Sequence, residues 1–207
     1  MKKKQRMQLI KSPQQLRSRQ MVRDIREAAI RVLKKHPASE FNTIRVAKEA
    51  GISVGSLYQY YPSKGAILFA IQMEEWEETR SRLEFILNQA EKPPIENLQE
   101  MVTYFFQSEW EERKLRQALR AVTFDLKTSR EFKKLQSNAK VAFSDYLIKN
   151  FQLTKADSAF WPDFILVSIT ALAEEITSRL STEKEVTGFA ERSGQMILGY
   201  FQSRNRK

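Results

Sequence analysis

The chain has no cysteine and only one histidine, His36, among its 207 residues. Without cysteine it can form no disulfide, no thiolate metal site and no thiol nucleophile, and this composition is typical of a cytosolic protein. One histidine cannot supply a pair of imidazole ligands, and neither a GxSxG sequence nor a glycine-rich phosphate loop is present. We therefore expect no enzymatic activity, no metal site and no cofactor.

Glycine and proline are also scarce, with six residues of each. Long stretches instead repeat apolar residues at intervals of three and four, which predicts an all-α fold. No run of eighteen apolar residues occurs, so we expect no membrane-spanning segment and no membrane partner. The basic N-terminus lacks the apolar segment of a secretory signal, which favours a cytoplasmic protein.

Positive charge is confined to the first third of the chain. Residues 1–64 contain fifteen Lys and Arg and four Asp and Glu, a net charge of +11, whereas residues 65–207 have a net charge of −1. Such a basic region is either an ordinary solvated surface or a surface for a polyanion such as nucleic acid.

Residues 42–64, NTIRVAKEAGISVGSLYQYYPSK, have the pattern of a helix-turn-helix. Val46, Ala47 and Ala50 have the spacing of one inward helical face, and Gly51 follows where a left-handed residue ends a helix. Ser53 can cap a second helix that runs to about Tyr60. Two helices joined by so short a turn are the arrangement that places the second helix in the DNA major groove.

The remaining pattern divides the chain into three parts: a basic arm at 1–16, a DNA-binding domain at 17–72 and a C-terminal domain at 73–207. We expect a first helix at 16–35 and a long helix at 63–88 that joins the two domains without a flexible linker. Phe41, Ile44, Ile52, Leu57 and Tyr61 should complete the small N-terminal core. Further helices are predicted at 95–112, 113–127, 129–151, 155–180 and 183–203, with capping boxes at Thr154 and Thr182.

The segment AKEAGISVGSLYQYYPSKGAIL resembles the DNA-binding motif of the TetR family of bacterial regulators, and the resemblance extends over about residues 20–72. It departs from the family at Gly65, where Glu is usual, and at His36–Glu40, which replaces a glycine-containing loop. The resemblance implies a three-helix DNA-binding domain joined by a long helix to a helical ligand-binding and dimerisation domain. It also implies a cytoplasmic homodimeric repressor that binds a palindromic double-stranded operator and is released by a small molecule.

The resemblance and the helical geometry together assign DNA contacts. Ser53, Val54 and Gly55 open the recognition helix and should face base edges, with Tyr58 one turn further along. The expected sugar-phosphate contacts are Thr43, Ser56, Gln59, Tyr60 and Lys64, and Arg45 can reach either a phosphate or a guanine edge. The arm residues Lys2, Lys3, Lys4 and Arg6 either contact DNA or form a solubilising tail.

Thirteen aromatic residues lie between Phe85 and Phe164. An aromatic stripe at helical spacing usually forms core, but this many aromatic residues can also line an apolar cavity for a small lipophilic or aromatic effector. The expected lining is Phe105, Phe106, Trp110, Phe124, Phe143 and Tyr146. Glu109 lies near the same face, where it is either a contact for a cationic ligand or, as we expect, a surface residue.

The last two helices are predicted to form the homodimer interface through two apolar stripes, with Gly194 and Gly199 allowing close helix packing. The stripes are Ile165, Ile169, Leu172, Ala173, Ile176 and Leu180, and then Phe189, Ala190, Met196, Ile197, Tyr200 and Phe201. The alternative is that they close the core of a single subunit. Two other readings of the whole chain are a ligand-blind architectural DNA-binding protein and a basic amphipathic helix at a membrane surface.

Overall fold

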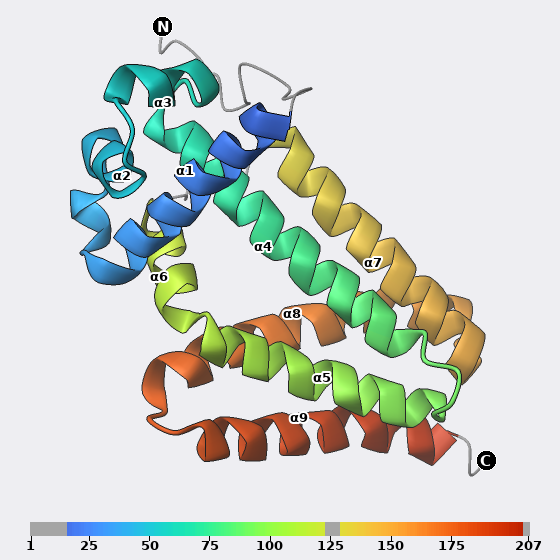
Figure 1. Ribbon diagram of the computed structural model, residues 1–207. Coiled ribbons are helices and arrows are strands. Elements are labelled where there is room, and N and C mark those ends of the chain that lie inside the picture. The colour runs from blue at the N-terminus through green and yellow to red at the C-terminus, as the bar shows by residue number, and fades with distance from the viewer. Residues whose placement is uncertain (1–15, 123–128, 205–207) are drawn as a thin grey trace, which may run out of the picture. The chain divides into compact units, whose positions relative to one another are not determined.

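The computed structural model describes residues 16–122 and 129–204, and these ranges contain nine α-helices, one short 3-10 helix and no strand (Figure 1). The all-α class predicted from the sequence is therefore confirmed. The elements are α1 (Leu16–Lys35), η1 (Ala38–Glu40), α2 (Thr43–Glu49), α3 (Val54–Tyr60), α4 (Lys64–Leu87), α5 (Pro94–Glu111), α6 (Arg113–Val122), α7 (Arg130–Phe151), α8 (Lys155–Arg179) and α9 (Glu183–Arg204).

The chain forms two compact units. The described residues up to Trp76, together with those of Lys114–Phe132, form unit 1, and Glu77–Arg113 with the described part of Lys133–Lys207 forms unit 2. The division falls inside α4, α6 and α7, so three helices continue from one unit into the other. The predicted boundary at residue 72, between the DNA-binding and C-terminal domains, stays a prediction. Unit 1 extends four residues further, to Trp76, and also contains residues of α6.

Unit 1 is built around the inward faces of α1 to α4. Leu57 and Tyr61 are buried, as the sequence predicts, and Phe41 is buried beside them. Leu115 and Leu119 of α6 belong to the same core, which the sequence did not indicate. Ile44 was expected in this core but is 68% exposed, because it lies on the outer face of α2 while Val46 and Ala47 occupy the inner one. The expectation for Ile44 was therefore wrong.

Two side-chain caps and one glycine define the helix-turn-helix. The Asn42 side chain accepts a hydrogen bond from the Arg45 N–H at the start of α2, and the Ser53 hydroxyl accepts one from the Ser56 N–H at the start of α3. Gly51, between the helices, has a φ of +67°, in the left-handed region that costs a residue with a Cβ energy. Asn42 therefore starts α2, and Gly51 and Ser53 lie in the four-residue turn that ends α2 and starts α3.

Unit 2 is arranged around α5, which packs against α9 and α8. Its core contains Phe106, Phe143, Leu147, Ile165 and Phe201. Gly194 of α9 is buried against α5, and a Cβ at this position would lie 2.2 Å from Oε1 of Gln99. Gly194 therefore allows a close approach between helices of the same chain, whereas a Cβ at Gly199 would meet nothing within 4 Å.

Both capping boxes predicted in unit 2 are present. The Thr154 hydroxyl accepts from the Asp157 N–H, and the Thr182 hydroxyl accepts from the Glu185 N–H at the start of α9. In return, the Glu185 carboxylate accepts hydrogen bonds from the hydroxyl and backbone N–H of Thr182 and from the backbone N–H of Ser181. The Thr182 hydroxyl and then these backbone N–H groups lower the pKa of Glu185, because they bind its ionised form.

This cap predicts an acid-dependent contribution of Glu185 to stability. Because its pKa is lower in the folded than in the unfolded chain, its contribution is complete above the unfolded pKa and is lost as pH falls through the folded pKa. We expect Glu185→Ala to lower the urea midpoint at neutral pH, and the gap from wild type to narrow on acidification. Glu183→Ala is the control, since that carboxylate in the same turn accepts no hydrogen bond from Ser181 or Thr182. A gap for Glu185→Ala that is independent of pH contradicts this account.

Candidate nucleic-acid interface

The recognition helix α3 presents a polar outer face. Leu57 points into the core of unit 1, and Tyr60 and Val54 are half-buried against it. The exposed residues are Ser53, Gly55, Tyr58 and Gln59, which are four of the residues predicted to contact DNA. Helix α3 carries no charged side chain, so its outer face offers hydroxyl, amide and backbone groups instead of positive charge.

Two predicted DNA-contacting residues, Thr43 and Tyr58, are joined directly. Their hydroxyl oxygens lie 3.1 Å apart, which connects the first residue of α2 to the exposed side of α3. Only 9% of Thr43 is exposed, whereas Tyr58 lies at the surface. One hydroxyl donates to the other in this pair, so the accepting hydroxyl keeps its own proton for an outside acceptor such as a phosphate oxygen.

The serine residues at the start of α3 also contact each other. The hydroxyls of Ser53 and Ser56 lie 2.9 Å apart, and Ser56 is half-buried. Because the Ser53 hydroxyl already accepts from the Ser56 N–H, it is held in the cap. Of the two, Ser53 is the more exposed to a ligand.

The predicted cationic contacts differ in their surroundings. Arg45 donates from Nη2 to Oε2 of Glu40 at 2.7 Å. Lys64 is exposed at the start of α4 and makes no ion pair with a described residue. Lys48 is likewise exposed on α2 without an ion pair to a described residue, and it was not among the predicted contacts. Its spacing of three residues from Arg45 on one helix was the signal that could have identified it.

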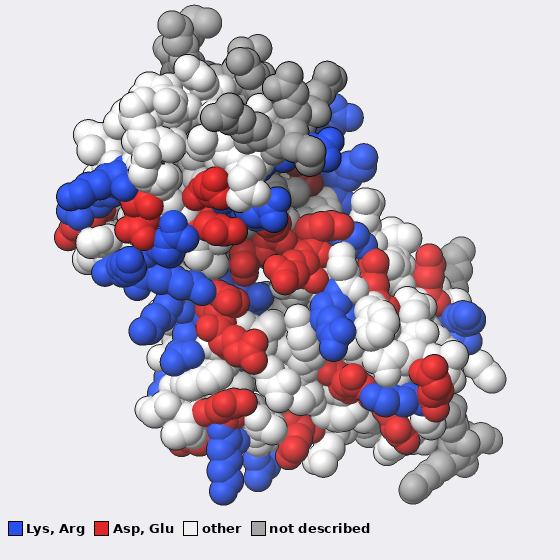
Figure 2. All heavy atoms as spheres, in the orientation of Figure 1, with Lys and Arg blue, Asp and Glu red and all other residues white. Residues whose placement is uncertain are grey.

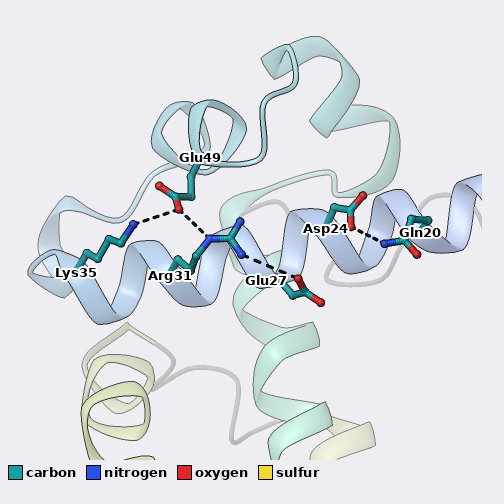
Figure 3. Close-up of polar contacts among 6 residues, drawn as sticks. All are labelled: Gln20, Asp24, Glu27, Arg31, Lys35 and Glu49. Carbon is teal, nitrogen blue, oxygen red and sulfur yellow. Dashed lines mark hydrogen bonds and ion pairs between the residues drawn. The ribbon is translucent and has the colours of Figure 1, made fainter.

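The Glu49 carboxylate forms ion pairs with two of the basic side chains of unit 1. Figure 3 shows Glu49 of α2 between two residues of α1, with Arg31 Nε at 2.8 Å and Lys35 Nζ at 3.3 Å from its Oε1. The hydrogen bond from Arg31, and then that from Lys35, lowers the pKa of the Glu49 carboxyl. This cluster ties α2 to α1, and it means that Arg31 and Lys35 contribute less to the outward charge than the residue count implies.

The space-filling view agrees with this mixed character. In Figure 2, Lys and Arg side chains gather over the end of α1 and beside α2, and Asp and Glu side chains lie among them. Lys34 and Lys35 occupy the last turn of α1, and Lys48 the last turn of α2. The arm residues Lys2, Lys3, Lys4 and Arg6 lie outside the described residues.

The candidate ligand residues are gathered in the core of unit 2. Phe106, Phe143 and Tyr146 are buried there, and Phe105 and Trp110 pack against the same cluster half-buried. Phe124 lies outside the described residues. The Tyr146 hydroxyl donates to the backbone oxygen of Pro94 at 2.7 Å, and burial raises the pKa of Tyr146 to about 12. Its polar group therefore serves the fold.

Two charged residues, Glu109 and Arg113, border this cluster, and the first differs from expectation. Glu109 was expected at the surface, but it is buried on the inner side of α5. Arg113 lies over the ring of Trp110, with its guanidinium carbon 3.7 Å from the ring centre, and donates to the Trp110 carbonyl. The last turn of α5 is thus held to the first residue of α6.

The apolar stripes predicted for a dimer interface mostly close the chain's own core. Residues Ile165, Ile169, Ala173 and Ile176 of α8 are buried, as are Ala190, Ile197 and Phe201 of α9. That part of the interface prediction was wrong, because each helix has two apolar faces and the inner ones pack on α5 and on each other. The exposed large apolar residues are Phe160, Phe164, Val167 and Leu172 on α8 and Phe189 and Met196 on α9.

Helix α8 is unusually apolar. Within the described residues, its segment Ala156–Arg179 is the one candidate for crossing a membrane by length and composition. Its most apolar stretch of 18 residues has a mean hydropathy of 1.2, and 22% of that stretch is buried.

The described residues contain no group of three or more His, Cys, Asp or Glu side chains that could hold a metal ion.

Comparison with known proteins gives a family match for the segment that contains the helix-turn-helix. Residues 25–71 match the model of bacterial regulatory proteins of the tetR family. A search of curated proteins gives no significant match. The fold is similar to that of a putative TetR-family transcriptional regulator from Mesorhizobium loti, with a TM-score of 0.70, 16% identity, and coverage of 90% of this chain and 98% of that one.

Two fatty acid regulators have the same fold. The fatty acid degradation regulator FadR from Bacillus halodurans has a TM-score of 0.68 and 17% identity, with coverage of 86% of this chain and 95% of that one. FadR from Bacillus subtilis in complex with stearoyl-CoA has a TM-score of 0.66 and 16% identity, with coverage of 85% of this chain and 97% of that one.

Proposed function

We propose that this chain, whose residues 25–71 match the model of bacterial regulatory proteins of the tetR family, is a homodimeric repressor released from a palindromic operator by a small lipophilic ligand. The chain is a DNA-binding transcriptional regulator and not an enzyme. The observation that carries the proposal is the capped, uncharged outer face of α3, which is exposed while Leu57 anchors its inner face. A protein with this role acts in the bacterial cytoplasm.

In this proposal α3 enters the major groove. Ser53, Val54 and Gly55 face base edges, and Tyr58 contacts a base or a phosphate through the hydroxyl pair that it forms with Thr43. Gln59, Tyr60, Ser56 and Lys64 face the sugar-phosphate backbone. Lys48 joins them as a further phosphate contact, since it is exposed on α2 and has no ion-pair partner among the described residues.

The exposed apolar side chains of α8 and α9 support a dimer. Phe160, Phe164 and Val167 recur at four and three residues, so they form one stripe along the outer side of α8. A soluble protein rarely leaves such a stripe in water, and a second copy of the same stripe would cover it in an isologous four-helix contact. The charged side chains Asp163, Glu174 and Glu175 on the same helix favour a protein partner over lipid.

A dimer gives the operator its symmetry. Two recognition helices related by a two-fold axis contact half-sites about one turn of B-DNA apart, roughly 34 Å, and so require a palindrome. The continuous helix α4 runs from unit 1 into unit 2 without a flexible linker. A ligand that binds better to the conformation with the wrong spacing would shift the dimer toward it and weaken DNA binding.

The aromatic cluster of unit 2 supports an effector with a long apolar part. Phe105 and Trp110 lie half-buried at the edge of a core that contains Phe106, Phe143 and Tyr146. The related fold of FadR from Bacillus subtilis binds stearoyl-CoA, so a long-chain acyl-CoA is the first effector to test. In this proposal residues 17–72 bind DNA, and residues 73–207 bind the effector and the second subunit.

Salt dependence tests the DNA contacts. The wild-type protein should be retained by the DNA upstream of its own gene, with an affinity that falls steeply as salt rises. We expect Lys64→Ala to weaken binding to that DNA and to scrambled DNA alike, and to reduce the slope of log affinity against log salt by about one. Electrophoretic mobility shifts over a series of salt concentrations measure both. Absence of salt-sensitive retention contradicts DNA binding, and an unchanged slope removes Lys64 from the phosphate contacts.

The oligomeric state tests the α8 surface. Val167 is 67% exposed, so Val167→Glu should leave the subunit folded but place two charges in a dimer interface. We expect wild type to sediment as a dimer and Val167→Glu to sediment as a monomer with weakened operator binding. Val141→Glu on α7 is the matched control, because Val141 is also exposed but lies outside this stripe. A monomeric wild type, or binding of the wild type to liposomes through α8, contradicts the proposed interface.

Release by ligand tests the effector class. Addition of stearoyl-CoA to the protein–DNA complex should abolish the mobility shift, whereas coenzyme A alone should not, because the apolar chain supplies most of the binding energy. If stearoyl-CoA, free fatty acids and aromatic lipophiles all leave the complex intact, the ligand-responsive part is wrong and a ligand-blind DNA-binding protein is favoured. A ligand-blind protein would have a C-terminal core filled by its own side chains. The Tyr146 hydroxyl, which donates to the Pro94 backbone oxygen, and the fully buried Phe106 agree with such a core.

A further inference from the structure

The short helix η1 places a carboxylate beside the α2 cation. Glu40 ends η1, its backbone oxygen accepts a hydrogen bond from the Asn42 side chain, and its Oε2 accepts one from Arg45 Nη2 at 2.7 Å. We propose that Glu40 is an intramolecular competitor for Arg45, which lowers the affinity of this protein for DNA of random sequence. This inference rests on the proposed DNA binding.

The surroundings of Arg45 place it beside the groups proposed to meet DNA. Arg45 is in the first turn of α2, where its own N–H is capped by Asn42. Thr43 of the same turn is hydrogen-bonded to Tyr58 of the recognition helix, so this end of α2 is fixed next to the reading face. Arg45 and Lys48 follow each other at a spacing of three residues, which puts both on one side of α2.

The ion pair between Glu40 and Arg45 is weak enough for Arg45 to leave Glu40 and bind a DNA group instead. Its two side chains are 45% and 43% exposed, and a single ion pair in contact with water is weak and screened by salt. Glu49 provides the contrast inside the same unit. Its side chain is only 28% exposed and is held by both Arg31 and Lys35, so it serves as a fixed connection. Glu40 has one cationic partner on a neighbouring turn and can be displaced from it.

The free energy gained when Arg45 leaves Glu40 for DNA depends on the DNA sequence. On a random sequence, a phosphate must take Arg45 from Glu40 and then remain close to the released carboxylate, so little is gained. On an operator, a guanine edge in register can bind the guanidinium through two hydrogen bonds, which compensates for the lost ion pair. Glu40 thereby reduces binding to the many competing sites more than binding to the operator.

The test measures random DNA binding after removal of the charge. We expect Glu40→Gln to raise the affinity for a random-sequence duplex about threefold at moderate salt and to steepen the salt slope by about one, because one more cation becomes available to phosphate. Glu27→Gln is the control, since it removes one exposed carboxylate from α1 of the same unit. The gain of Glu40→Gln should disappear when it is combined with Arg45→Ala.

The outcomes separate this inference from the proposed function. If wild type and every variant fail to bind DNA, the proposed function is wrong. If wild type binds but Glu40→Gln matches it, or if Glu27→Gln gives an equal gain, Glu40 is not a competitor for Arg45. A gain that survives in the background of Arg45→Ala also overturns the inference, because Glu40 would then act on DNA directly.

Discussion

The recognition helix depends on burial because it is too short to be stable alone. An isolated helix of seven residues does not persist in water, since the cost of nucleation exceeds the few hydrogen bonds that it gains. Leu57 and Tyr61 anchor α3 in the core of unit 1, and the Ser53 cap fixes its first turn. The outer face is consequently held in place mainly from its buried side, with the Ser53 cap and the Thr43–Tyr58 hydrogen bond as its polar supports, and Gly55 and Gln59 remain exposed to a partner.

The sequence predicted the helices well because their ends carry local signals. The cap at Ser53, the glycine at Gly51 and the capping boxes at Thr154 and Thr182 all act within four residues, and the structure contains each of them. The inward faces of α3 followed from its periodicity in the same way. The DNA and effector contacts stay predictions, since the structure shows where those side chains lie and contains no partner.

The prediction of buried and exposed residues failed on helices that have apolar residues on more than one face. Periodicity marks Ile169 and Phe189 equally as apolar, yet one lies in the core and the other at the surface, because the position of α5 decides which face is covered. Ile44 is a similar case on a short helix. Ion pairs between distant residues, such as Arg31 with Glu49, could not be predicted either, since nothing in the local pattern brings α2 to that turn of α1.

The core of unit 1 is completed from outside the helix-turn-helix. Leu115 and Leu119 of α6 are buried in it, and Phe132 at the start of α7 lies with its ring centre 5.0 Å from that of Trp76. A fragment cut after the fourth helix would leave hydrophobic surface in water and lack these packing partners. Helices α1 to α4 therefore do not form a complete core by themselves. A chimera that joins them to a different ligand-binding domain must also include α6 and the first turn of α7.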